Sequence, residues 1–344
     1  MTLAGCTVVG PRAVLSGRMA YNEAIVETNN QQMLMVFVHN RYEQTNHLLS
    51  VSSVTANVSV SSSAQFQAGI GSSDNYEGNL VPFSGGFVYE ENPTISYTPV
   101  AGETYLRQLM SPLPLSDAVA IIQSLPHPEL AYYMLIASVN GIGNPAFLYD
   151  KRHGDPRFER FVGLMVGLGR EQCIYWPTGQ EVPKATIMQV RSSEACAGPL
   201  AELLGLLGVA VPIQPGEQVS VPVTHMHGSE SPAGVAINTR TIWNLVEILS
   251  AAVEVPPEDE SNGVAASFPK RGGMVDELRI RYSSDRPEAA YVVIQHRDGW
   301  FYIDDGDLVT KRYFKLLASL WSAAMSKSLI DNSSAPVLTV PVSG

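Results

Sequence analysis

The first element predicted by the spacing of apolar residues is a long helix. Residues 18–44 place Tyr21, Ile25 and the run Met33–Val38 at helical spacing. The run is apolar on every face, so this part of the helix should be enclosed. Residues 1–17 end in a stretch of turn residues without a period, which predicts a tether ahead of the helix.

The pattern changes to alternation over residues 50–102, where small polar residues alternate with apolar ones. Successive residues of a strand point to opposite faces, so this period predicts strands. Pro93 and Pro99 favour an edge position for the second arm. We expect a long β-hairpin, with interface positions at Val54, Val58, Val60 and Tyr97.

Helical patterns resume in the middle of the chain, where we predict a helix capped by Ser116, a helix over Pro128–Val139 and a helix over 155–169. The second half alternates between the two periods. Its predicted strands are 185–191, 219–224, 276–284, 289–305 and 335–342, and its predicted helices are 199–208, 239–255 and 308–325. Residues 254–273 are rich in Pro, Gly and charge, which predicts a loop.

These elements together predict an α+β protein. We expect an N-terminal helix and long β-hairpin, a helical middle, and a C-terminal mixed α/β region. The predicted division is a tether at 1–17, a region of helix, hairpin and helices at 18–170, and a mixed α/β domain at 171–344.

Composition narrows the possible partners. The chain has 344 residues, of which 45% are hydrophobic and 16% charged, and this supports a packed globular core. Its formal net charge is −11, so a phosphate backbone would be repelled, and we predict no nucleic-acid partner. No uncharged apolar run reaches the length of about 18 to 20 residues that a membrane-spanning helix needs.

No motif in the chain predicts a cofactor or a catalytic residue. The Gly-rich stretch 141–147 lacks the third glycine of a dinucleotide fingerprint, so we interpret it as a loop. His225 and His227 are two positions apart and could share a metal ion on a strand, but no third ligand is obvious. We prefer to interpret them as part of a polar turn.

Three carboxylates, Asp304, Asp305 and Asp307, follow an aromatic strand. They could perform acid–base chemistry or hold a divalent cation, although their spacing does not match a calcium-binding loop. The interpretation that we prefer is the start of a helix, where a carboxylate caps backbone N–H groups and favours the positive end of the helix dipole.

The chain has three cysteines, which form neither a disulfide framework nor a zinc pattern. Cys6 ends the sequence Leu3-Ala4-Gly5-Cys6, which has the small residues of a lipoprotein cleavage site. Cys173 and Cys196 would then remain either as two buried thiols, which we prefer, or as a disulfide in an oxidising compartment.

Five segments resemble a widespread, uncharacterised Gram-negative family of envelope lipoproteins. They are RMAYNEAIVETNNQQMLMVFVHNRYEQ, VSSVTANVSV, NPTISYTPVAGETYLRQLMSPLP, VEILSAAVEVPPE and, near the C-terminus, WFYIDDGDLVTKRYFKLL with APVLTVPV. The resemblance implies lipidation at Cys6, after removal of a signal peptide that a misassigned start or trimming has left out of the sequence. Thr7 after the cysteine favours the outer membrane over the inner one.

The sequence therefore predicts an outer-membrane lipoprotein whose periplasmic body acts as a structural or assembly component. Its expected partners are the membrane, through the lipid, and either an envelope protein or further copies of itself. One alternative is an oligomeric pore or export subunit that uses the hairpin at 50–102. A second alternative is a periplasmic hydrolase that uses the acids at 304–307.

Overall fold

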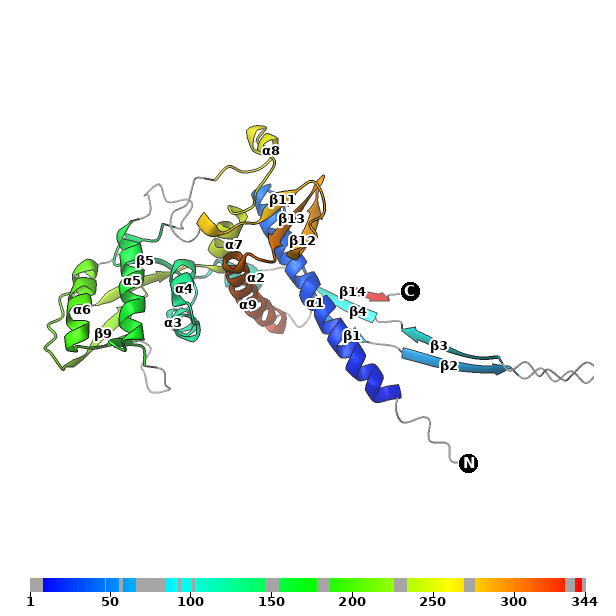
Figure 1. Cartoon of the computed structure of the whole chain (residues 1–344), viewed down its shortest axis with the longest axis horizontal. Coiled ribbons are helices and arrows are strands. Elements are labelled where there is room, and N and C mark those ends of the chain that lie inside the picture. The colour runs from blue at the N-terminus through cyan, green and yellow to red at the C-terminus, as the bar shows by residue number, and fades with distance from the viewer. Residues whose placement is uncertain are drawn as a thin grey trace, which may run out of the picture. The chain divides into compact units, whose positions relative to one another are not determined.

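The computed structural model has mixed helices and strands, and it confirms the α+β class (Figure 1). It describes residues 9–46, 48–55, 58–65, 84–91, 94–100, 103–145, 155–177, 186–225, 234–268, 276–331 and 338–341. The chain divides into two compact units. The first unit comprises Met1–Asn46 with Gly102–Asp331, and the second comprises His47–Ala101 with Asn332–Gly344.

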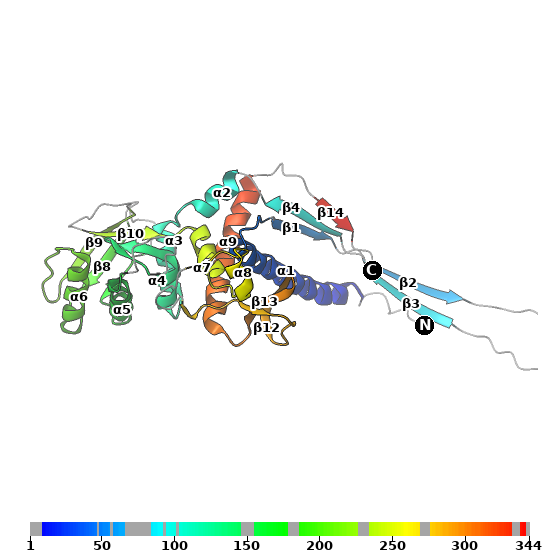
Figure 2. The same ribbon diagram turned by 90° about the horizontal axis from the view of Figure 1, so that it is seen from above.

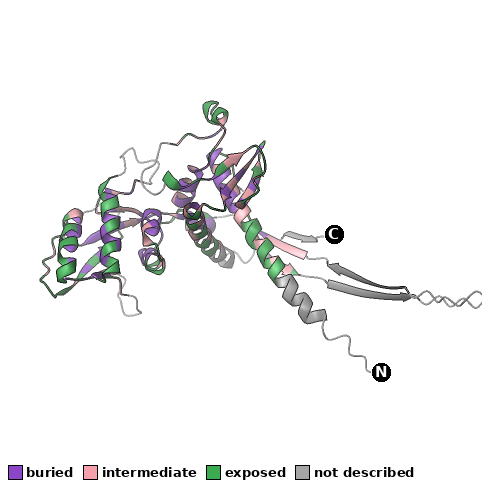
Figure 3. Cartoon of the chain, viewed as in Figure 1, coloured by how far each residue is buried: buried purple, intermediate pink, exposed green. Residues whose placement is uncertain are grey.

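The first unit begins with α1 (Val9–Arg41), a single helix that is longer than the sequence predicted. The expectation of a tether up to residue 17 is wrong, because the helix starts at Val9. Pro11 falls in the first turn, where backbone N–H groups have no helical partner, so proline is tolerated there. The run Met33–Val38 is enclosed as expected, because all of its residues except Met35 are buried. Figure 3 shows that the described part of α1 changes from exposed to buried along its length.

A six-stranded sheet forms one part of the first unit. Its order is β6-β5-β10-β9-β8-β7, and β9 and β10 are its parallel pair. Figure 2 shows α4, α5 and α6 along one face of this sheet. The strands are β5 (Ile136–Val139), β6 (Ile142–Gly143), β7 (Ile174–Tyr175), β8 (Thr186–Arg191), β9 (Gln218–Thr224) and β10 (Val235–Thr239), and the associated helices are α3 (Leu115–Ser124), α4 (Pro128–Leu135), α5 (Arg157–Arg170) and α6 (Glu194–Leu207).

Two boundaries differ from the sequence expectation in this region. The helix predicted over Pro128–Val139 ends at Leu135, and the chain continues directly as β5, which pairs with β10. Ser116 lies inside α3, whose N-cap position is Pro114. The predicted division after residue 170 falls inside the first unit, because strands from both sides of it share the same sheet.

A three-stranded sheet of order β11-β13-β12 forms the other part of the first unit. Its aromatic core joins distant elements: the Phe37 ring of α1 meets the Phe314 ring of α9 edge-on, with centroids 5.9 Å apart. The elements of this part are α2 (Glu103–Met110), α7 (Ile242–Ser250), α8 (Pro257–Ser261), β11 (Arg281–Ser283), β12 (Ala290–His296), β13 (Gly299–Asp304) and α9 (Leu308–Asp331). The loop predicted at 254–273 thus contains the short helix α8. No described helix is long and apolar enough to cross a bilayer.

The second unit confirms the long hairpin. Its base pairs β1 (Leu48–Thr55) with β4 (Thr94–Val100), and its outer part pairs β2 (Val58–Gln65) with β3 (Ser84–Glu91). Both pairs are antiparallel. The strand β14 (Leu338–Pro341) adds to the free edge of β4, which gives a three-stranded sheet of order β1-β4-β14.

Candidate functional site

The acids after β13 are used to start a helix. Helix α9 begins at Leu308, and Asp307 Oδ1 accepts the Thr310 N–H at 3.0 Å while Oδ2 accepts the Thr310 hydroxyl at 2.6 Å. Asp304 Oδ1 accepts the Gly306 N–H at 2.9 Å, and Asp305 forms an ion pair with Lys311 at 2.6 Å. Each carboxylate therefore has a local structural partner, as the helix-start interpretation requires.

Of the two histidines considered as metal ligands, the structure describes only His225. His225 Nε2 lies 3.1 Å from Thr239 Oγ1, across the parallel pair of strands. His227 lies outside the described residues, as does Cys6. Within the described ranges, no group of three or more His, Cys, Asp or Glu residues could hold a metal ion.

The predicted interface residues fall on both parts of the long hairpin. Val54 pairs with Ile95, and Tyr97 pairs with Val51 and Leu338. Because opposite residues share a face, the register places these five residues on one apolar face of the β1-β4-β14 sheet. Val54 and Tyr97 are half-buried there.

The outer part of the hairpin has a similar division. Val58 lies opposite Glu91, Val60 opposite Tyr89 and Ser62 opposite Phe87. The intervening positions pair Ser59 with Glu90, Ser61 with Val88 and Ser63 with Gly86. One face of the β2–β3 pair therefore has mostly valine and aromatic positions together with Glu91, whereas the other has mostly serine positions together with Glu90 and Val88.

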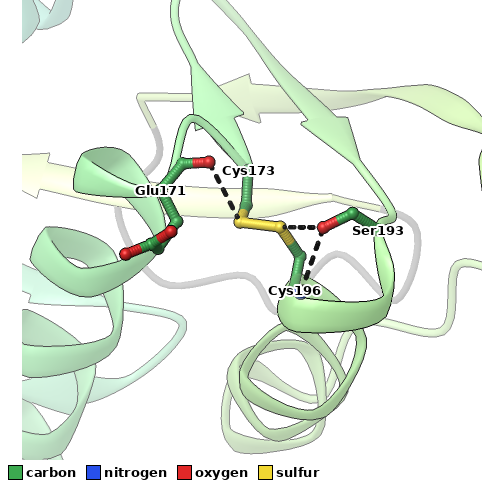
Figure 4. Close-up of a disulfide and its surroundings, with 4 residues drawn as sticks. All are labelled: Glu171, Cys173, Ser193 and Cys196. Atoms are coloured by element: carbon green, nitrogen blue, oxygen red, sulfur yellow. Dashed lines mark hydrogen bonds between the residues drawn. A yellow bond between two sulfur atoms is a disulfide. The ribbon is translucent and has the colours of Figure 1, made fainter.

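The preferred interpretation of Cys173 and Cys196 as two buried thiols is wrong, because the structure has the disulfide between them (Figure 4). Cys173 precedes β7, Cys196 lies in the first turn of α6, and their Cα atoms are 5.9 Å apart. Both residues are buried, with 1% and 3% exposure. Ser193 donates to Cys196 Sγ at 2.8 Å and caps α6 by accepting the Cys196 N–H.

A buried arginine connects elements of the first unit through its backbone. Arg240 directly follows β10 and is 1% exposed. The backbone N–H of Arg240 donates to the Leu135 carbonyl at 2.8 Å, and the backbone carbonyl of Arg240 accepts the Leu113 N–H at 3.0 Å. Burial lowers the pKa of Arg240 to about 10, against the opposing influence of Tyr313 and Glu247, so the side chain stays charged at neutral pH. We interpret this residue as a structural cation.

A groove follows the exposed part of α1. It has a volume of about 610 Å³ and lies between α1 and β12. Met19 and Val26 are 77% and 53% exposed on its helical wall, where Glu23 and Glu27 also lie. The mixture of exposed apolar and acidic groups suits surface contact better than the enclosure of a small ligand.

The C-terminal end of α1 carries a cluster that the sequence analysis missed. The His39 and His296 ring centroids are 5.1 Å apart, and those of Tyr42 and His296 are 5.3 Å apart. Phe301 completes the set at 6.1 Å from both Tyr42 and His296. We call these four residues the ring cluster. His39 and Tyr42 are far in sequence from His296 and Phe301, so no local pattern of residues indicates the cluster.

Polar contacts surround the ring cluster. The Tyr42 hydroxyl donates to Asp259 Oδ2 at 2.7 Å, and His39 Nδ1 lies 3.1 Å from Asn46 Oδ1. Burial raises the pKa of Tyr42, and the contact with Asp259 adds to this. Burial also lowers the pKa of His39 and of His296, and the mutual repulsion of charged rings lowers the pKa of His296 further.

Comparison with known proteins found no matching family model, no similar curated protein and no similar solved structure.

Replacing Asp307 with Ala should lower the free energy of unfolding by about 0.5 to 2 kcal/mol, because the cap of α9 is lost. Asp307→Asn should recover most of this stability, since asparagine also caps. Asp305→Ala is the matched control and should cost less, because its ion pair is exposed. Urea denaturation would measure all three variants. A divalent ion bound by the wild type would instead reverse this interpretation.

Removing the disulfide should destabilise the first unit. The two cysteines are 23 residues apart, and a loop of this size predicts a cost of about 3 kcal/mol. We expect the double variant Cys173→Ala/Cys196→Ala to unfold at a lower urea concentration than the wild type. Ala201→Ser, at an exposed position of α6, is the control substitution outside the pair. Equal midpoints for the double variant and the control would contradict the prediction.

Proposed function

We propose that the protein is an outer-membrane lipoprotein of the Gram-negative envelope, whose periplasmic body is an assembly component that self-associates through the long hairpin (residues 48–100). The proposed role is structural rather than catalytic. The lipid on Cys6 would hold the body at the membrane, and the hairpin would supply contacts between copies.

The observation that carries this proposal is the sheet order of the outer hairpin. In the described part of the chain, β2 and β3 pair only with each other. A two-stranded hairpin alone is marginally stable in water. Monomeric proteins protect exposed strand edges with charges, above all lysine. Residues 48–73 contain no charged residue, so the edge of β2 lacks this protection.

The apolar face of the hairpin base supports the same proposal. Val51, Val54, Ile95 and Tyr97 share one face, and all four are only half-buried. Covering this face with another copy would remove apolar surface from water, at a gain of roughly 25 cal/mol per Å². A symmetric partner is the simplest source of a complementary face, because most soluble oligomers are built from identical chains.

The buried disulfide supports an oxidising compartment. Disulfides persist in secreted and periplasmic proteins and are rare in the cytosol. The Cys173–Cys196 disulfide therefore favours the periplasm over the cytosol as the location of the protein. Together with Leu3-Ala4-Gly5-Cys6, it agrees with a lipoprotein of the periplasmic face.

The anchor is tested at Cys6. Expressed with its genomic upstream sequence, the protein should partition into membranes and carry a diacylglycerol mass, and Cys6→Ser should release it. Lipid chains give stable anchoring without a spanning helix. Intact mass measurement and membrane fractionation check both expectations. An unmodified Cys6 in native cytosolic protein would refute the anchor while leaving self-association open.

Self-association is tested on the two faces of the outer hairpin. Val58→Lys and Ser59→Lys each introduce a charge at the edge, on opposite faces, and at least one should reduce the oligomer to a smaller species. Ser220→Lys places the same charge on an exposed strand position of the first unit and should leave the mass unchanged. Native mass spectrometry and light scattering report the mass. The hairpin is no interface if both hairpin variants match the wild type.

The division of faces in β2–β3 favours one alternative, an oligomeric pore or export subunit. One face carries valine and aromatic positions, with Glu91 at its end, and the other face is rich in serine, which is close to the alternation of strands that meet lipid on one side and water on the other. Vesicles loaded with a dye would separate the two functions. Dye release that Val58→Lys abolishes would favour the pore, whereas oligomers that leave vesicles intact would favour the structural assembly.

A further inference from the structure

We propose that the contact between His39 and His296 is an acid-sensitive latch, which holds the C-terminal end of α1 against the β12–β13 turn and loosens when the rings become charged. The inference does not depend on self-association of the long hairpin.

The latch joins α1 and β12, two elements that are far apart in the sequence. His39 lies in the last turn of α1, and His296 is the last residue of β12. Their ring centroids are 5.1 Å apart, with an interplanar angle of 59°. Each ring also belongs to the ring cluster with Tyr42 and Phe301. Displacing either histidine would therefore disturb the packing of this end of the helix.

The acidic groups around the latch are already engaged. From α8, Asp259 accepts the Tyr42 hydroxyl at 2.7 Å, and Glu260 lies 3.5 Å from the Arg41 guanidinium. Neither carboxylate forms a described hydrogen bond with a histidine ring. His296 Nε2 is buried and has no hydrogen-bond partner among the residues that the structure describes.

The remaining charged and titratable neighbours oppose protonation or are neutral. Arg297 lies over the Tyr42 ring, 5.3 Å from its centroid, and disfavours a charge on His296. Tyr282 from β11 packs against Phe301 in a tilted arrangement, with ring centroids 5.3 Å apart. Of the surrounding groups, Asp259 favours a charged His296, but burial, His39 and Arg297 act against it. A proton on one ring therefore also disfavours a proton on the other.

The sign of the pH effect follows from these neighbours. The folded state lowers both histidine pKa values below the ordinary value of 6.5, so the unfolded state binds more protons just below that pH. Stability from the latch is present at pH values above about 6.5. It decreases as the pH falls from there through the folded-state pKa values.

The position of the latch gives it a structural consequence. His39 also contacts Asn46, the last residue of the first unit before the long hairpin begins at β1. The segment between His39 and Asn46 includes Glu43, which has a left-handed backbone with φ of 51°. Loosening the latch would free this connecting segment. Acid would thus act at the point where the chain leaves the first unit.

Hydrogen exchange tests the latch on the full-length protein. Peptides from 33–46 and 290–301 should exchange about threefold faster or more at pH 5.5 than at pH 7.5, after correction for the intrinsic pH dependence. His296→Phe keeps a ring but cannot be protonated, so it should reduce this acid response, and the double variant His39→Phe/His296→Phe should abolish it. His127→Phe, at an exposed position of the same unit, should respond like the wild type.

Two results would overturn the latch. One is a wild type whose two peptides show no acid response, and the other is a His296→Phe variant with an unchanged response. If His296→Phe fails to fold at pH 7.5, His39→Phe and a nuclear magnetic resonance titration of the wild type decide the question. Both rings should then titrate below 6.5, and ordinary titration of both would refute the inference.

Discussion

The burial of the apolar run Met33–Val38 is the constraint on which the first unit depends. These residues come early in the chain, but the elements that enclose them, among them α7, α9 and β12, come from its last third. Full burial of one large apolar side chain stabilises a protein by about 1.5 to 3 kcal/mol. The run therefore connects the N-terminal helix to residues 242–331, and the long hairpin is an insertion between α1 and α2 rather than a separate N-terminal domain.

Much of the fold could be predicted because apolar residues recur in its helices and strands at the spacing typical of each. The helices α5 and α9 and the strands of the long hairpin follow local patterns of apolar residues and lie close to where these patterns placed them. Helix α6 was also predicted, but it starts at Glu194, ahead of the predicted start at Pro199. The errors fall where a pattern is ambiguous. The buried run that ends α4 and begins β5 is apolar throughout, so periodicity cannot show that the chain changes from helix to strand at Ile136. The hydrogen bonds between β5 and β10 determine that the chain is a strand from Ile136 onward.

The candidate sites show the same distinction between local and distant information. Capping by Asp307 was predictable because the acid, the helix start and Thr310 are neighbours in the sequence. The ring cluster was not, since Tyr42 and its partner Asp259 are 217 residues apart. The choice between thiols and a disulfide at Cys173 and Cys196 also required the fold, which brings β7 and the start of α6 together.

The strand β14 has a consequence for how the chain reaches its final state. It pairs with β4 through residues 338–341, so the β1-β4-β14 sheet cannot be completed until these residues have been synthesised, more than 230 positions after β4. Pairings between such distant segments form slowly, because closing a long loop costs entropy before the contact is gained. Until then, β4 has an open edge that other strands can join. The order of synthesis therefore leaves an interval in which the partner of the free edge of β4 is still to be decided, so the rate of synthesis becomes a determinant of which strand this edge acquires.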